Sequence, residues 1–308
     1  MNGVLVVDKP GGPTSHDVVA RARRALGISR IGHTGTLDPL ATGVLPLVVG
    51  RATRLAQFLS GEEKEYDAGI RLGYATPTYD ADQRLFADPL TGEHVLSQPP
   101  PPAPPGIDGG QIEAALGRFT GTYFQSPPPF SAKKIGGTPA YKLARRNQPV
   151  AIRPVEVTVS ALRLEGYDNG LARVRVACSA GFYVRSLAHD LGELLGCGAH
   201  LETLRRTRAG DFTLAHAVAL GDVERMGVEA AARMIPMSSL LPLLPPVVVN
   251  EEGARRAAHG NALAPRDLAE CAAAGVAPRV RVLDAQGTLL GIAEQASGGL
   301  LHPVVVLV

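Results

Sequence analysis

Several segments of the chain have apolar and polar positions in the pattern of β-strands. Residues 3–8 form a short apolar run, and residues 64–74 alternate apolar side chains with charged or small ones. The same alternation over residues 155–164 and 171–178 predicts two further strands. Tyr167-Asp168-Asn169-Gly170 lies between these two strands, so we expect them to form a hairpin.

Apolar positions spaced three or four residues apart predict helices between these strands. The first helix is capped by Thr14 or Ser15, carries Asp17 in its first turn and ends at Gly27. Further helices are expected over residues 51–59, from residue 111 to 116, over 139–146, over 186–195 and from Ala199 through Leu204. Strands mixed with helices, without regular βαβ alternation, predict an α+β fold with a mixed, largely antiparallel sheet flanked by helices.

The pattern changes after a proline-rich joint over residues 234–246. Beyond it, short β-type runs are separated by glycine-rich turns. We therefore expect one domain over residues 1–245 and a small all-β barrel over residues 246–308.

Composition narrows the class of protein. Apolar residues make up 45% of the chain and charged residues 19%, which is typical of a globular protein. No apolar run approaches the length of a membrane span, and the N-terminus lacks the pattern of a signal peptide. The three cysteines are too scattered for a disulfide framework or a zinc site. We expect a soluble cytoplasmic protein without a structural metal.

Basic residues are concentrated locally although the net charge is only +2. No Asp or Glu occurs between residues 118 and 153. The basic residues of this stretch are Arg118, Lys133, Lys134, Lys142, Arg145, Arg146 and Arg153. Such a patch on a nearly neutral chain indicates that one face holds a polyanion.

The segment with the most candidate chemistry is the glycine-rich stretch over residues 30–46. It contains His33 and, as its only acid, Asp38, which precedes a proline and therefore lies in a turn. Alone, Asp38 is more often a structural turn residue than a catalyst. Asp80 and Asp82 lie two residues apart in another turn, where hydrogen bonding is favoured over metal binding.

The string GHTGTLDPLATG, from Gly32 to Gly43, closely resembles the catalytic motif of the TruB family of tRNA pseudouridine synthases. The resemblance covers nearly the whole chain and includes several further motifs in the family's order. These are Lys9-Pro10 with Thr14-Ser15, Lys64-Glu65-Tyr66 with Thr76 to Asp80, Ser131 to Lys134 with Tyr141 and Arg145, Cys178 to Arg185, and Leu204-Arg205-Arg206. The resemblance implies a pseudouridine synthase fold with a C-terminal PUA-like domain.

The resemblance also implies roles for residues of this sequence. Asp38 acts at C1′ of the target uridine and Arg185 is its cationic partner. Tyr66 stacks on the target base, and Tyr183 and Leu204 line the pocket, although ordinary core packing also accounts for these last two. Whether Asp38 attacks C1′ or the reaction passes through a glycal is left open. The isomerisation is redox-neutral and requires no cofactor and no metal.

Substrate recognition is implied as well. His33 occupies the space that the flipped uridine 55 leaves in the T loop of tRNA, and a basic loop over about residues 118–153 clamps the RNA. Phosphate contacts are expected from Lys9, Arg21, Lys133, Lys134, Arg145 and Arg205. The resemblance implies that a monomer acts on tRNA without guide RNA, protein partner or membrane.

Three features depart from the family pattern. Ala180 replaces a residue that is often basic, Phe182 replaces a smaller polar one, and the proline run over residues 98–105 has no role that we can assign. An archaeal or eukaryotic relative that uses guide RNA is disfavoured because its motif differs at Leu40-Ala41. A protein whose main task is to help RNA fold remains an alternative.

Overall fold

The computed structural model describes residues 1–81, 104, 106–131, 134–135, 138–139, 153–269 and 277–308. Three predictions fall wholly or mostly outside this part of the chain: the roles of Lys133 and Arg145, the helix over residues 139–146 apart from Pro139, which lies in a strand, and the proline run apart from residue 104. Lys134 belongs to a two-stranded sheet of β6 (Lys134–Ile135) and β7 (Thr138–Pro139), but its side chain is likewise outside the described part.

A single mixed sheet forms the centre of the molecule. Its strand order is β12-β1-β3-β10-β4-β9-β8-β5, and β2, β11 and β13 pair with β3, β10 and β1 respectively. The strands are β1 (Gly3–Lys9), β2 (Ile31–His33), β3 (Thr42–Val49), β4 (Lys64–Leu72), β5 (Gly121–Gln125), β8 (Val155–Asp168), β9 (Leu171–Cys178), β10 (Ala199–Ala209), β11 (Phe212–Thr213), β12 (Val218–Ala219) and β13 (Ile235–Pro236). Among these pairs only β1 with β12 and β3 with β10 are parallel. The predicted α+β class and the hairpin of β8 and β9 are confirmed.

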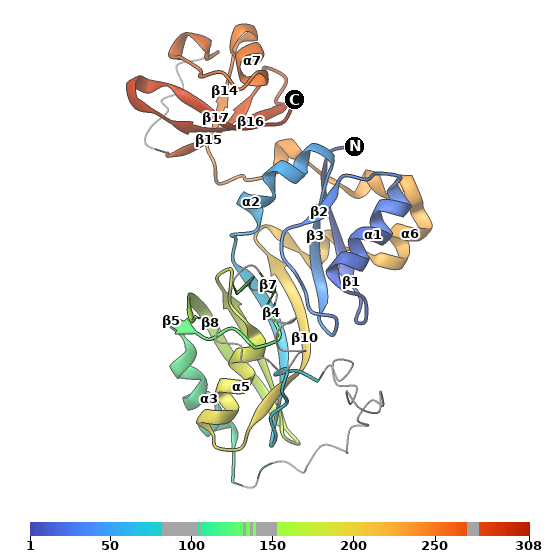
Figure 1. Cartoon of the computed structure of the whole chain (residues 1–308), viewed down its shortest axis with the longest axis vertical. Coiled ribbons are helices and arrows are strands. Elements are labelled where there is room, and N and C mark those ends of the chain that lie inside the picture. Colours follow the sequence, from blue (N-terminus) through green and yellow to red (C-terminus); the bar gives the residue numbers. More distant parts are fainter. Residues whose placement is uncertain (82–103, 105, 132–133, 136–137, 140–152, 270–276) are drawn as a thin grey trace.

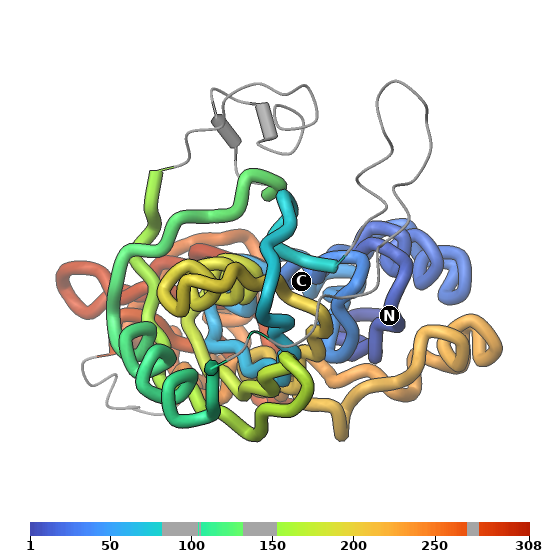
Figure 2. The backbone as a smooth tube through the Cα atoms, turned by 90° about the horizontal axis from the view of Figure 1, so that it is seen from below, coloured from blue at the N-terminus to red at the C-terminus, as the bar shows by residue number. Residues whose placement is uncertain are grey.

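Helices cover this sheet at two places. The α-helices are α1 (Ser15–Leu26), α2 (Ala56–Leu59), α3 (Gly109–Leu116), α5 (Val184–Leu194) and α6 (Leu220–Met226). Figure 1 shows α1 and α6 beside β1, and α3 and α5 at the other end of the sheet near β4, β8 and β10. Seen from below, Figure 2 shows the same separation, with the green and yellow coils of α3 and α5 away from the blue coils of α1. One apolar core lies between the sheet and helices α1, α3, α5 and α6.

The ends of α1 agree with the sequence. Thr14 is the cap: its hydroxyl accepts a hydrogen bond from the Asp17 amide, while the Asp17 carboxylate accepts one from the Thr14 amide. Gly27 ends the helix in the left-handed conformation, at a φ of 65°. The helix predicted over residues 51–59 is a 3₁₀ turn (Gly50–Leu55) followed by α2.

The helix predicted from Ala199 is wrong, because residues 199–209 form strand β10. The pairing of β10 with β4 has irregularities at Leu201/Thr203 and Arg206/Arg208. Each irregularity shifts the alternation, so the buried Leu201 and Leu204 lie three residues apart as they would on a helix face. Strand β10 carries two side chains that line the candidate site, Leu204 and Arg206.

The C-terminal part contains a four-stranded sheet in the order β14-β15-β16-β17. Its strands are β14 (Pro246–Val248), β15 (Arg279–Leu283), β16 (Leu289–Gln295) and β17 (Leu301–Val306). The expectation of an all-β unit is wrong, because helix α7 (Glu251–Ala258) packs on this sheet. The barrel and its PUA-like character stay predictions.

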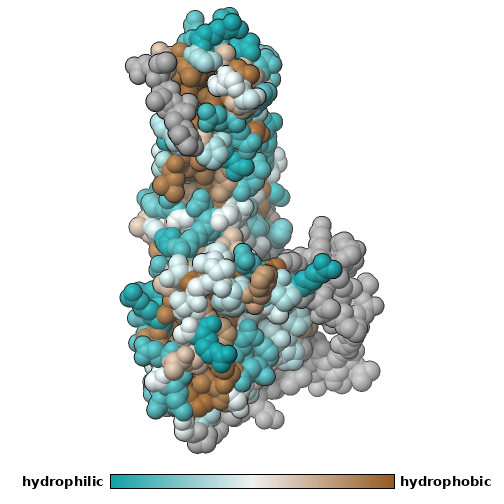
Figure 3. Space-filling view, turned by 90° about the vertical axis from the view of Figure 1, so that its left-hand side faces the viewer, coloured by the Kyte–Doolittle hydropathy of each residue, from teal (hydrophilic) through white to brown (hydrophobic). Residues whose placement is uncertain are grey.

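An apolar cluster joins this C-terminal sheet to the rest of the chain. Leu289, Ile292 and Val305 pack in one cluster with side chains of β1 and β3. On the face seen in Figure 3, apolar residues appear as separate patches among hydrophilic ones. No helix in the described ranges is long and apolar enough to cross a membrane.

Candidate active site

The loop that carries Asp38 connects β2 to β3 and is fixed by hydrogen bonds from several elements. The Ser15 hydroxyl, at the start of α1, accepts from the Leu37 amide at 2.8 Å and donates to the Leu37 carbonyl at 3.1 Å. Within the loop, the Ala41 amide donates to the Asp38 carbonyl at 3.0 Å, and the Gly12 amide donates to Pro39 at 2.8 Å. The backbone around Asp38 is therefore held on both sides.

Lys9 is part of this support and not of an RNA-facing surface. Its side chain is 0% exposed, and its ammonium donates to the carbonyls of Pro39 at 3.1 Å and Ala41 at 2.6 Å. The predicted phosphate contact of Lys9 is wrong for this structure, because the ammonium is enclosed by the loop that it holds. The sequence does not reveal this, since the Pro39 and Ala41 carbonyls are backbone oxygens some thirty residues away.

Asp38 forms a two-pronged ion pair with Arg185. The guanidinium approaches Oδ2 through Nε at 2.9 Å and donates to Oδ1 through Nη2 at 3.1 Å. Arg185 lies in the first turn of α5 and is 6% exposed. Because a cation shielded from water interacts strongly with a carboxylate, this pair fixes the position of the Asp38 side chain.

Arg185 has a second carboxylate partner that sequence analysis did not identify. Its Nη1 lies 3.6 Å from Oδ2 of the buried Asp80 and donates to the Thr78 carbonyl at 3.2 Å. The predicted hydrogen-bonded turn is confirmed for Asp80, because the Thr78 hydroxyl donates to Asp80 Oδ1 at 2.7 Å, while Asp82 lies outside the described residues. The spacing of Asp80 suggested only this local bond, whereas the ion pair crosses more than a hundred residues of sequence.

A cavity of about 570 Å³ opens in front of this ion pair. Asp38, Tyr66, Tyr183, Arg185 and Leu204 all line it, so the structure brings together five of the predicted site residues. They come from four different elements of the chain. Tyr183, just before α5, is held on both sides of its backbone by the Gln125 side chain, at 2.8 and 3.0 Å.

Tyr66 and Arg206 face each other across β4 and β10. Burial raises the pKa of the Tyr66 phenol, and the positive charge of Arg206 opposes this effect. Arg206 is 1% exposed and donates to the carbonyls of Val44 at 2.7 Å and Gly35 at 3.1 Å. The guanidinium therefore joins β3 and the Asp38 loop to β10, a role that sequence analysis missed.

The close approach of β3 and β10 requires a glycine at position 43. Gly43 has a φ of 97°, and a Cβ atom there would lie 2.2 Å from the Arg206 carbonyl oxygen. The glycine-rich motif thus has a packing reason next to Asp38.

His33 lies at the end of β2, directly before Thr34, which lines the cavity. Its ring contacts that of His16 edge to face, with the centroids 5.5 Å apart. Burial, together with the charges of His16 and Arg206, lowers the pKa of His33. Its Nδ1 is buried without a hydrogen-bond partner among the described residues. The neutral ring therefore presents an aromatic surface near the cavity and not a fixed charge.

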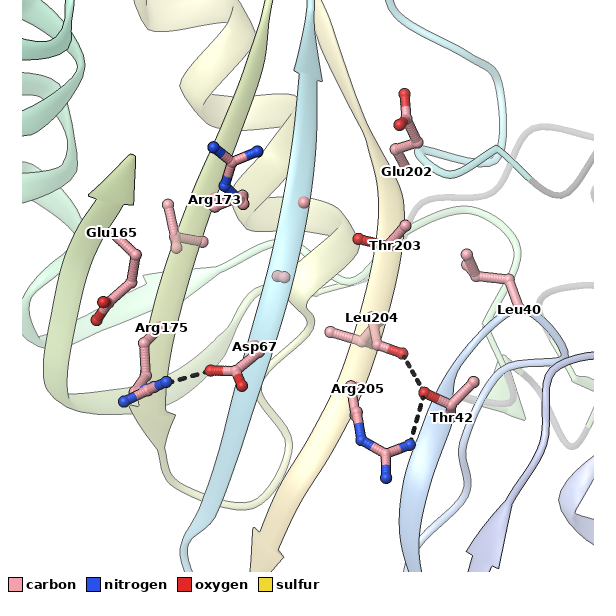
Figure 4. Close-up of a pocket in the computed structure, with 13 residues that line it drawn as sticks. Leu40, Thr42, Asp67, Glu165, Arg173, Arg175, Glu202, Thr203, Leu204 and Arg205 are labelled. Carbon is pink, nitrogen blue, oxygen red and sulfur yellow. Dashed lines mark hydrogen bonds and ion pairs between the residues drawn. The ribbon is translucent and has the colours of Figure 1, made fainter. Parts of the chain in front are cut away.

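Arg205 and Arg21 lie away from Asp38. Arg205 points to the opposite face of the sheet, where it pairs with Asp8 at 2.7 Å and lines a groove with Thr42 and Asp67 (Figure 4). Arg21 pairs with Glu224 at 2.6 Å on the surface of α1. The structure does not bring either arginine to the cavity, so their phosphate contacts stay predictions.

The site combines an ionised carboxylate, a buried guanidinium and aromatic rings around one opening. This set of groups suits a flat, polar ring attached to a sugar, since aromatic side chains stack on bases. Within the described ranges, no group of three or more His, Cys, Asp or Glu side chains is placed to hold a metal ion.

Family models match consecutive parts of the chain. Residues 23–184 match the TruB family pseudouridylate synthase N-terminal domain, and residues 185–247 match the tRNA pseudouridylate synthase B C-terminal domain. Residues 245–307 match a second C-terminal model, pseudouridine synthase II TruB. The chain belongs to the TruB family. The predicted resemblance is confirmed.

Members of the TruB family are similar to this chain over its full length. The tRNA pseudouridine synthase B of Solibacter usitatus (strain Ellin6076) is 42% identical over 309 residues and covers 100% of both chains. The tRNA pseudouridine synthase B of Burkholderia pseudomallei (strain 668) is 43% identical over 304 residues, covering 98% of this chain and 96% of the relative.

Solved structures share the fold of this TruB family member. A chain in an H/ACA RNP bound to a substrate RNA containing 2′-deoxyuridine matches with a TM-score of 0.72 and 25% identity, over 99% of this chain and 85% of that one. A chain of the archaeal box H/ACA sRNP Nop10-Cbf5 complex matches equally well, over 99% and 86%. The predicted pseudouridine synthase fold is thus confirmed.

Proposed function

We propose that this chain is a tRNA pseudouridine synthase that isomerises uridine 55 in the T loop of tRNA. The observation that carries the proposal is the Asp38–Arg185 ion pair, which holds an ionised carboxylate in a cavity lined by Tyr66 and Tyr183. Relatives named tRNA pseudouridine synthase B, similar over the full length, support the same activity.

In this reaction the bond between N1 of uracil and C1′ breaks, the uracil turns, and a bond forms between C5 and C1′. The proton on C5 is lost and N1 gains one, so the reaction needs neither an oxidant nor a cofactor. Asp38 acts at C1′, as a nucleophile or by stabilising positive charge, or it assists elimination to a glycal. Arg185 pairs with its carboxylate at 2.9 Å and holds it at the cavity.

Tyr66 serves this reaction first as a stacking surface. Because burial raises the pKa of its phenol above the usual value near 10, the hydroxyl remains protonated at neutral pH. The ring therefore supports the uracil while it turns, and the hydroxyl can donate a hydrogen bond. Removal of the C5 proton by Tyr66 requires a neighbour that accepts the phenolic proton.

The target base must leave the stacked T loop before it reaches Asp38, at a cost of a few kcal/mol. We propose that His33 fills the vacated space, because its half-buried, neutral ring lies next to the cavity rim. Lys133, Lys134 and Arg145 are the proposed phosphate contacts of the clamp loop.

We further propose that residues 1–245 are the catalytic domain and residues 246–308 a PUA-like RNA-binding domain. The proposed substrate is tRNA in the cytoplasm, with the chain acting as a monomer. Although the matched chains belong to H/ACA ribonucleoprotein complexes, the Leu40-Ala41 pair of the central motif favours action without guide RNA or protein partners.

The test is the Asp38→Asn variant with tRNA that carries tritium at C5 of its uridines. The proposal predicts that tritium release falls by about 10³-fold or more, while tRNA binding is retained, because the amide keeps the shape but not the charge. Asp67→Asn is the matched control: Asp67 lies on the same sheet but on its outer face, paired with Arg175 at 2.8 Å.

Full activity of Asp38→Asn would overturn the catalytic assignment. Mapping of pseudouridine in the product tests the substrate, and a modified position outside the T loop would contradict it. If the wild-type chain bound tRNA and formed no pseudouridine, the RNA-folding alternative would replace the proposed function.

A further inference from the structure

A parallel stack of two aromatic rings joins the turn over residues 76–80 to helix α5, which carries Arg185. The rings of Tyr79 and His189 have centroids 3.8 Å apart and an angle of 5° between their planes. Tyr79 belongs to the turn over residues 76–80, which follows β4, and His189 lies on α5. Neither residue lines the Asp38 cavity.

The backbone at Tyr79 adopts a conformation that side chains rarely take. Its φ is 64°, in the left-handed region that favours glycine. The Tyr79 amide donates to the Thr76 carbonyl at 3.0 Å, and the Tyr79 carbonyl accepts from the Leu201 amide of β10 at 2.9 Å. Such a conformation persists only where surrounding contacts hold it, and the ring stack is one of these contacts.

The two residues on either side of Tyr79 both contact Arg185. The Thr78 carbonyl accepts from Nη1 at 3.2 Å, and the Asp80 carboxylate lies 3.6 Å from the same nitrogen. The direction of both groups depends on the dihedral angles of Tyr79 between them. A change at Tyr79 therefore changes how the turn holds the guanidinium.

His189 follows Arg185 by four residues, so the two side chains lie on the same side of α5, one turn apart. The helix thus contacts the turn twice, through an ion pair at Arg185 and through a ring stack at His189. Two contacts fix the separation and the rotation of two elements, whereas one contact leaves the rotation free.

We propose that the Tyr79–His189 stack positions Arg185 for catalysis: it fixes the turn over residues 76–80 against α5, so that the guanidinium reaches both oxygens of Asp38. Tyr79 and His189 are positioning residues, since they act through Arg185. The inference rests on the proposed function, because its consequence is a change in the rate of uridine isomerisation.

The experiment compares His189→Ala, which removes one ring, with His189→Phe, which keeps a flat ring. The measurements are the single-turnover rate on T-loop tRNA, the Kd for that tRNA and the thermal midpoint. His189→Ala is expected to lower the rate between about tenfold and a hundredfold, since displacing a catalytic group by about 1 Å has effects of this size. Its Kd should stay within about twofold of wild type, and His189→Phe should restore most of the rate.

His200→Ala is the matched control. His200 makes the other histidine–tyrosine contact of this connection, with Tyr74 at 4.4 Å between centroids, but Tyr74 does not adjoin the residues that hold Arg185. An equal loss of rate in His200→Ala would assign the effect to general packing and overturn the proposal. An equal rate in His189→Phe and His189→Ala would overturn it too, because a flat ring at position 189 would then not restore catalysis. An unchanged rate in His189→Ala would overturn it as well.

Two further measurements keep the outcome decisive. If His189→Ala does not fold, Tyr79→Asn removes the other ring, since asparagine tolerates a positive φ; unchanged catalysis in that variant would contradict the proposal. Amide hydrogen exchange over residues 76–81 should be faster in His189→Ala than in His200→Ala, and this readout needs no activity. If exchange is faster in His189→Ala than in His200→Ala but the wild-type chain forms no pseudouridine, the proposed function is refuted. If the wild-type chain is active and exchange is equal in the two variants, the positioning role of the Tyr79–His189 stack is refuted.

Discussion

The two faces of the sheet at β4 and β10 both carry charged side chains, but they use them differently. On the outer face, Arg175 pairs with the carboxylate of Asp67 (Figure 4). Arg205, on the same face, is partly exposed and pairs with the carboxylate of Asp8. On the inner face, Arg206 and Lys9 are fully buried and bind backbone carbonyls around the Asp38 loop. Arg205 and Arg206 are neighbours in sequence, and alternation along the strand alone sends them to opposite faces.

The difference between the two faces shows which charged side chains determine the shape of the site. An ion pair in contact with water adds little to the free energy of unfolding, because water screens the charges and both side chains lose conformational freedom. A buried cation that binds backbone oxygens cannot leave without exposing those oxygens to an apolar interior. The buried Arg206 and Lys9 therefore fix the shape of the Asp38 loop, whereas the ion pairs of the outer face contribute little to it.

The largest expected difference is between Arg206→Met and Arg205→Met. Arg206→Met leaves the Val44 carbonyl without its donor and releases Gly35, so we expect a loss of about 2–4 kcal/mol in the free energy of unfolding. Arg205→Met removes one surface ion pair and should cost about 0–1 kcal/mol. Urea unfolding of both variants measures the two values, and equal losses would show that the two faces do not differ.

A smaller loss of stability, but a clear effect on catalysis, is expected for Lys9→Met. The bond to Ala41 is fully buried, while those to Pro10 and Pro39 are partly accessible to water, so the expected cost is about 1–3 kcal/mol. Because the lost bonds hold the backbone beside Asp38, the single-turnover rate should fall while the salt dependence of tRNA binding is unchanged. A flatter salt dependence would instead reveal a phosphate contact of Lys9.

The smallest effect is a pH dependence of stability that the buried Cys178 thiol on the inner face should produce. Burial raises the pKa of the Cys178 thiol to about 12, from 9.0. Below pH 9 the thiol is protonated in both states and contributes nothing to the pH dependence. Above pH 9 it ionises only in the unfolded chain, so stability falls by up to about 1.4 kcal/mol per pH unit.

Cys178→Ala should abolish this alkaline loss. The free energies of unfolding of the wild type and the variant are measured in urea at pH 8, 9 and 10. Only above pH 9 should the wild type lose free energy of unfolding relative to the variant. The cavity left by the smaller side chain adds a constant and does not alter this trend. A difference that stays constant to pH 10 would contradict the buried environment of the thiol.

Local patterns predicted the parts of the fold that depend on neighbours in sequence. The Thr14 cap, the Gly27 stop and the hairpin of β8 and β9 follow from adjacent residues and are confirmed. The strand β10 was mistaken for a helix because its irregular pairing with β4 is decided by a partner some 130 residues away.

The same distinction applies to the site. The motif around Asp38 and the family resemblance named Tyr66 and Arg185, which the structure brings to one cavity. Lys9, Asp80 and Arg206 act through partners that no local pattern reveals, two of them through backbone oxygens. The sequence contains no signal for a backbone carbonyl that needs a hydrogen-bond donor from a distant side chain.

The pairing of β1 also has a consequence for the synthesis of the chain. Besides β3, this N-terminal strand pairs with Val218–Ala219 and with Ile235–Pro236. At a synthesis rate of about 5–20 residues per second, β1 waits about 10–50 s on the ribosome before these partners exist. During that time one edge of the apolar strand β1 has no strand to pair with. A newly made chain therefore depends on its surroundings to prevent that edge from pairing with another molecule.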